Sequence, residues 1–153
     1  MLKQTNIDFD YSLFLEEYEK IREHEVDYGR QGKSVDFWRV IRNDNLNSDL
    51  AYSYADFVKH KYGIIGKTNV SFYRLTANST LPWHIDTDTK CSINFILNGD
   101  ASPVSYRSGD YTYKQALIQT NIEHSVTNGN KDRILYKISI FDMDFKDVAS
   151  LLP

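Results

Sequence analysis

The sequence has few of the residues that mark several common protein classes. Its 153 residues include a single cysteine, Cys91, with only three prolines and seven glycines. One cysteine excludes a disulfide bond within the chain and is typical of a reducing compartment. Hydrophobic residues make up 41% and charged residues 25%, which is the composition of a globular protein. The length predicts one domain with a core of its own.

Long apolar runs and an excess of one charge are also missing. No stretch is long and apolar enough to span a bilayer, and the segment from Met1 to Asp10 does not resemble a signal peptide. The net charge is −3 and no basic stripe is present, so the chain is not expected to bind nucleic acid. We expect a soluble, cytoplasmic protein that acts on a small molecule or a peptide. The oligomeric state is not indicated.

Residues 1–66 are predicted to be mainly helical. Apolar residues recur at helical spacing from Leu13 to Ile21, and either Asp10 or Ser12 would cap that helix. A second helix is expected from Asn47 or Ser48 to near Gly63.

The connection between these helices is less regular. The polar stretch from Asp27 to Lys33 breaks the helical pattern, and the short apolar piece from Val35 to Ile41 fits either a helix or a strand.

Residues 67–142 are predicted to form a β core, and residues 143–153 a tail with a last helix from Asp144 to Leu152. The core segments are short, rich in β-branched and aromatic residues, and separated by turn signals. Their density predicts a single α+β domain, mainly β, with a double-sheet jelly roll. The predicted strands are Val70–Thr76, Cys91–Leu97, Pro103–Tyr106, Tyr111–Gln119, His124–Thr127 and Arg133–Phe141.

A candidate metal site begins at Leu81-Pro82-Trp83-His84-Ile85-Asp86. In an extended chain, residues two apart project to the same side, so His84 and Asp86 would face one point. His124 stands about forty residues later, at the start of another strand. Two histidines and one carboxylate leave three positions open on a metal, an arrangement that suits Fe(II), which would bind a cosubstrate through two positions and oxygen through the third. The alternative is that His84 and Asp86 bond only to each other or to a loop.

Arg133 follows His124 by nine residues, at the opening of a strongly apolar strand. A guanidinium matches a carboxylate with two parallel hydrogen bonds, so Arg133 would bind the far end of a dicarboxylate that chelates the metal. The alternative is a solvated charge at a strand end beside Asp132.

These segments together resemble the Fe(II)/2-oxoglutarate-dependent oxygenases. The resemblance covers about Val70 to Phe141 and is nearest to the aspartyl/asparaginyl β-hydroxylase-like branch and its small phage and bacterial relatives. It is carried by the runs Phe72-Tyr73-Arg74-Leu75-Thr76, Leu81 to Asp86, Cys91–Leu97, Ala116-Leu117-Ile118, His124 to Gly129 and Asp132-Arg133-Ile134.

The resemblance implies a double-stranded β-helix of the cupin-like kind, with N-terminal helices packed on it. It also implies a dioxygenase that uses Fe(II), 2-oxoglutarate and O2 to hydroxylate an amino-acid side chain or a small metabolite. His84, Asp86 and His124 carry over as iron ligands, and Arg133 as the partner of 2-oxoglutarate. The spacing from His124 to Arg133 is about one residue shorter than the family pattern.

Three neighbouring residues are further candidates. Tyr73 and Asn94 would hydrogen-bond 2-oxoglutarate, or else pack on the sheet and satisfy a loop. Asp88 would replace Asp86 as the ligand if the strand ended early. Two other functions remain open: a cupin-like metal protein without catalysis, and a phage accessory module in which the HxD pattern is incidental.

Overall fold

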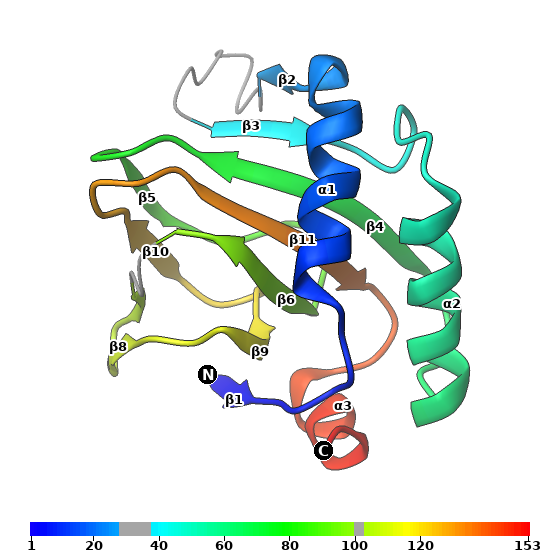
Figure 1. Cartoon of the computed structure of the whole chain (residues 1–153). Helices are drawn as coiled ribbons and strands as arrows, with labels where there is room; N and C mark the ends of the chain where they lie inside the picture. Colours follow the sequence, from blue (N-terminus) through cyan, green and yellow to red (C-terminus); the bar gives the residue numbers. More distant parts are fainter. Residues whose placement is uncertain (28–37, 100–102) are drawn as a thin grey trace.

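Two antiparallel β-sheets face each other and form the body of the molecule (Figure 1). The computed structural model describes residues 1–27, 38–99 and 103–153. Within these ranges the smaller sheet has the order β5 (Thr80–His84), β10 (His124–Thr127), β7 (Val104–Tyr106) and β8 (Gly109–Tyr111). The larger sheet has the order β1 (Leu2–Gln4), β9 (Gln115–Gln119), β6 (Cys91–Asn98), β11 (Arg133–Ile140), β4 (Thr68–Leu75), β3 (Trp38–Ile41) and β2 (Val26–Asp27). The predicted jelly roll is confirmed.

Helices cover the outer face of the larger sheet (Figure 1). They are α1 (Tyr11–Ile21), the short 3-10 turn η1 (Arg22–His24), α2 (Asp49–Tyr62) and α3 (Phe145–Leu151). The Asp10 carboxylate accepts a hydrogen bond from the Leu13 amide and caps α1, and the Ser48 hydroxyl caps α2 in the same way. Gly63 ends α2 in the left-handed conformation, with a φ of 75°. All three predicted helices are therefore confirmed.

Strand β11 contacts the helices with one face and the cavity with the other. It pairs along its length with β4 on one side and with β6 on the other. Tyr136, Ile138 and Ile140 point outward and are buried among the helices. Arg133, Leu135 and Lys137 point inward, toward the smaller sheet, where they line a cavity. The two-residue period of a strand produces this division.

Three parts of the chain differ from the expectation or are not tested. Strands β1 and β3 lie in the region expected to be mainly helical. Strand β3 forms the part of the undecided segment from Trp38 to Ile41, and the rest of that segment, residues 35–37, lies outside the described residues. The expected strand Tyr111–Gln119 is wrong, because the chain leaves the smaller sheet after β8 and enters the larger one as β9. The expected break at Asp27 to Lys33 lies, except for Asp27, outside the described residues, and the division at residues 66 and 142 stays a prediction.

The described helices include none long and apolar enough to cross a membrane.

The Gln115 side chain fastens the N-terminal segment to the larger sheet. Its amide oxygen accepts hydrogen bonds from the Ile7 backbone N–H at 2.7 Å and from the Thr5 hydroxyl at 2.8 Å. Its amide nitrogen donates to the Ile7 carbonyl oxygen at 2.9 Å. Gln115 and Ile7 are both buried, so no water can replace these bonds without opening the structure.

We expect Gln115→Leu to lower the free energy of unfolding by about 2–4 kcal/mol, because it leaves the buried Ile7 amide and carbonyl without partners. The matched control is Gln119→Leu on the same strand, since among the described residues the Gln119 side chain bonds only to the exposed Asn121 side chain. The control should change stability by about 0.5 kcal/mol or less. Urea unfolding measures both, and equal losses would contradict this account of Gln115.

Candidate metal centre

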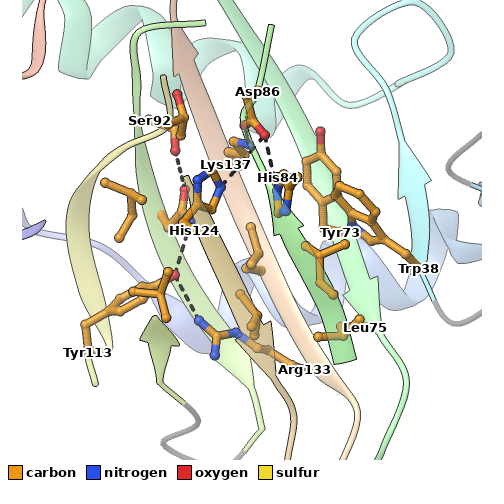
Figure 2. A pocket seen from close by; sticks show the side chains of 17 residues that line it. Trp38, Tyr73, Leu75, His84, Asp86, Ser92, Tyr113, His124, Arg133 and Lys137 are labelled. Carbon is orange, nitrogen blue, oxygen red and sulfur yellow. Dashed lines mark hydrogen bonds and ion pairs between the residues drawn. The ribbon is translucent and has the colours of Figure 1, made fainter. Parts of the chain in front are cut away.

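Three side chains converge where the two sheets meet. His84 ends β5, Asp86 lies two residues later, and His124 begins β10 directly opposite His84 in the antiparallel register. The Asp86 Oδ1 atom lies 3.4 Å from His84 Nε2 and 3.8 Å from His124 Nε2. One ligand atom from each residue can be chosen so that all lie within 4.8 Å of one another. The structure thus brings the three predicted ligands together, as Figure 2 shows.

Backbone carbonyls determine which imidazole nitrogen faces the centre. His84 Nδ1 lies 2.7 Å from the Pro82 carbonyl oxygen, and His124 Nδ1 lies 2.8 Å from the Ile122 carbonyl oxygen. A carbonyl oxygen only accepts, so both Nδ1 atoms carry the proton and donate it. Both Nε2 atoms are left with a lone pair directed at Asp86, and this tautomer is the one that a metal-binding histidine needs.

The charge states also suit a divalent cation. Burial, reinforced by the neighbouring His84 imidazole, lowers the pKa of His124 to about 4, so this ring is neutral at neutral pH. Burial raises the pKa of Asp86, but opposing interactions, of which that with the nearby Lys137 ammonium is the largest, outweigh burial and hold that pKa well below its usual range. Bonds from imidazole or carboxylate to a metal are about 2.0–2.2 Å long, so two donors on one ion lie about 3–4 Å apart. The observed separations fit this requirement.

Lys137 holds the other oxygen of the Asp86 carboxylate. Its Nζ lies 3.4 Å from Asp86 Oδ2, and both side chains are largely buried. This contact directs Oδ1 toward the two histidines. The sequence analysis missed Lys137, although a signal was present: it lies four residues after Arg133 on one strand, and so on the same side of the sheet.

Arg133 lies at the opposite end of the same cavity, with an exposed fraction of 3%. Its guanidinium donates to the Tyr113 hydroxyl at 3.0 Å, and Asn94 Nδ2 donates to the same hydroxyl at 3.1 Å. The oxygen of Tyr113 thus accepts two hydrogen bonds, which leaves its own proton to be donated elsewhere. Tyr113 was not predicted, because no periodicity shows that the connection before β9 reaches Arg133.

The remaining predicted residues are found in different surroundings. Tyr73 and Asn94 both line the cavity, and Asn94 Oδ1 accepts a hydrogen bond from the Ser92 hydroxyl at 2.9 Å. Asp88 is exposed and lies outside the group of three ligands. Arg74 points away from the site, where it forms ion pairs with Glu25 and Asp132.

Apolar side chains form most of the wall between the metal centre and Arg133 (Figure 2). They come from both sheets, so the cavity is closed on two sides by paired backbone. A wall of this kind keeps water away and strengthens the electrostatic interactions inside. The apolar residues of the wall are Leu75, Leu81, Val104, Ile118, Val126 and Leu135.

Gly99 packs against the backbone that carries Arg133. Its φ is 128°, a conformation that side chains rarely adopt. A Cβ atom at this position would lie 3.1 Å from Arg133 Cα and 3.2 Å from the Asp132 carbonyl oxygen. The turn after β6 therefore sets the position at which Arg133 enters the cavity.

Comparison with known proteins shows the fold. No protein-family model matches the sequence, and no curated protein matches it.

A prolyl-4-hydroxylase of Pseudomonas putida is similar in structure, with a TM-score of 0.66, 10% identity, and coverage of 94% of this chain and 92% of that one. HygX of Streptomyces hygroscopicus, solved with nickel, 2-oxoglutarate and hygromycin B bound, has a TM-score of 0.62, 12% identity, and coverage of 94% and 84%. A 2-oxoglutarate-Fe(II) oxygenase family protein of Burkholderia pseudomallei has a TM-score of 0.59, 14% identity, and coverage of 91% and 82%. The chain thus has the double-stranded β-helix fold of 2-oxoglutarate-Fe(II) oxygenases.

We expect His84→Ala and Asp86→Ala each to abolish stoichiometric metal binding while the fold is retained, because each removes one of three ligands. The matched control is His60→Ala, since His60 is exposed on α2. Metal content after anaerobic loading with Fe(II), together with far-UV circular dichroism, measures both effects. Retention of one equivalent of metal by Asp86→Ala would contradict the ligand assignment.

We expect Lys137→Met to weaken metal binding by about 10- to 100-fold, because Asp86 loses the contact that orients its carboxylate. Lys131→Met, in the exposed turn before β11, is the control and should bind metal as the unchanged chain does. Competition with a fluorescent chelator under argon measures the affinity. An unchanged affinity in Lys137→Met would show that Asp86 is held by other contacts.

Proposed function

We propose that this chain is an Fe(II)- and 2-oxoglutarate-dependent dioxygenase that hydroxylates an amino-acid side chain or a small metabolite. One observation carries the proposal: two histidines and an aspartate converge at one end of a cavity whose other end holds a buried arginine. A dicarboxylate has a group for each end. The similar structures support this reading, and the relation to the aspartyl/asparaginyl β-hydroxylase-like branch stays a prediction.

The residues of the chain divide the work. His84 and His124 present Nε2 lone pairs, and Asp86 presents Oδ1, so that three positions of a six-coordinate ion stay open. Bound Fe(II) would supply the activation of O2, with oxidation of 2-oxoglutarate to succinate and carbon dioxide and transfer of one oxygen atom into a C–H bond of the substrate. Arg133 and the Tyr113 hydroxyl would bind the distal carboxylate, and the apolar wall would exclude water around it.

Arg133 also separates this proposal from a cupin-like protein that only binds metal. Such a protein has no use for a guanidinium in the cavity, whereas the distal carboxylate of a bound dicarboxylate would pair with it. The distinguishing experiment incubates the purified chain with Fe(II), ascorbate and 2-oxoglutarate and measures succinate. No turnover of 2-oxoglutarate, with no shift in the melting temperature on its addition, would favour the metal-binding protein.

We expect Arg133→Ala to keep its metal but to weaken 2-oxoglutarate binding by about 2–5 kcal/mol, because the distal carboxylate loses its charged partner. Arg22→Ala is the control, since Arg22 in η1 is exposed, does not line the cavity, and forms an ion pair with Glu19. Calorimetric titration of the Ni(II)-loaded chain with 2-oxoglutarate measures the affinity. Normal binding by Arg133→Ala would exclude Arg133 as the carboxylate partner.

A further inference from the structure

A second, more open cavity continues from the metal centre toward the surface. It shares Tyr73, Asp86 and Lys137 with the inner cavity, so the two spaces adjoin at the candidate metal site. We call it the outer groove. Its floor is the continuation of β4 and β11 beyond Tyr73 and Lys137. A molecule in the outer groove would lie beside the metal, on the side opposite Arg133.

The inner face of β4 and β11 changes character along its length. Around Arg133 the inward side chains include Leu75 and Leu135, which are apolar. Beyond the metal centre, Ser71 lies opposite Lys137 and Asn69 lies opposite Ser139 in the strand register. Successive inward residues on a strand are about 7 Å apart, so this row of polar groups extends about 7 Å past Lys137.

Three polar side chains face the outer groove. Ser71 is 6% exposed and Ser139 is 7% exposed. Neither hydroxyl, nor the Asn69 amide, forms a hydrogen bond with any residue of the described ranges. None of these polar atoms is enclosed by protein, so each can be reached from the outer groove. A ligand in the outer groove would supply partners for all three.

The charges of the outer groove balance outside the metal centre. Apart from Asp86 and Lys137, which face each other at the metal centre, the groove has two positive side chains, Arg42 and Lys67, and two negative ones, Asp44 and Asp88. Lys67 is also held by the ring of Phe141, with its Nζ 4.5 Å from the ring centroid. A balanced rim does not favour a strongly anionic or cationic ligand. The hydroxyl and amide groups, which both donate and accept, favour a ligand of the same kind.

We propose that the outer groove binds the substrate, and that the substrate is a small, hydrophilic, uncharged molecule with several hydroxyl or amide groups, of the size of a sugar. This inference rests on the proposed oxygenase function. Ser71, Ser139 and Asn69 bind the polar groups of the molecule and thereby hold one of its C–H bonds beside the metal. A proline-containing peptide and an aliphatic chain do not satisfy this row.

The test uses the full chain loaded with Ni(II) and 2-oxoglutarate, so that binding is measured without turnover. The probes are methyl β-D-glucopyranoside, N-acetyl-D-glucosamine, L-asparagine, a proline-containing tetrapeptide and decanoate. We expect at least one of the two sugars to raise the melting temperature and to give a measurable affinity by calorimetry. Binding of neither sugar, whichever of the other probes binds, would overturn the proposal.

Substitutions in the outer groove test whether the probe binds there. Ser139→Ala and Asn69→Ala should each weaken binding of the hydrophilic probe by about tenfold, the effect of losing one hydrogen bond with its buried partner. Ser53→Ala, on the exposed side of α2, is the control and should bind as the unchanged chain does. Unchanged affinity in both groove variants would overturn the proposal. Absence of 2-oxoglutarate binding in the unchanged chain would instead refute the oxygenase function, so the two failures are distinguishable.

Discussion

The alternation of side chains along β11 is the constraint on which the rest of the structure depends. Backbone hydrogen bonds to β4 and β6 hold this strand on both sides, so it can neither slip nor rotate without breaking two ladders. A slip by one residue would place Tyr136 in the cavity and Lys137 among the helices. The same register that builds the helix-covered core therefore also aims Arg133 and Lys137 at the smaller sheet.

The smaller sheet positions His84 and His124 with two short strands, β5 and β10. The pairing of β5 with β10 places His84 opposite His124, and the bond from the Asp86 amide to the Thr120 carbonyl oxygen, at 3.0 Å, holds the chain as it leaves β5. Two short strands suffice because each histidine is further fixed by a carbonyl oxygen two residues earlier along the chain. Local bonds thus orient the ligands, and the larger sheet supplies the rigid wall behind them.

The parts of the structure that could be predicted from sequence are those set by local spacing. Helix caps at Asp10 and Ser48, and the shared side of His84 and Asp86, follow from a few neighbouring residues. The roles of Lys137 and Tyr113 depend on which strands become neighbours and in which register, and a single sequence does not carry that information. Strand β1 was not predicted, and the segment that contains β3 was undecided, for a similar reason: pairing with β9 and β4 stabilises these strands more than their own composition does.

Gly99 gives this site an unusual sensitivity to change at a residue that touches no ligand. Any larger residue there would press on the main chain at Asp132 and Arg133 and also strain its own backbone. Replacement of Gly99 would therefore displace the Arg133 guanidinium within the cavity, although Gly99 itself does not line the cavity. In a library of random variants, position 99 should be as intolerant of substitution as a position whose side chain lines the cavity.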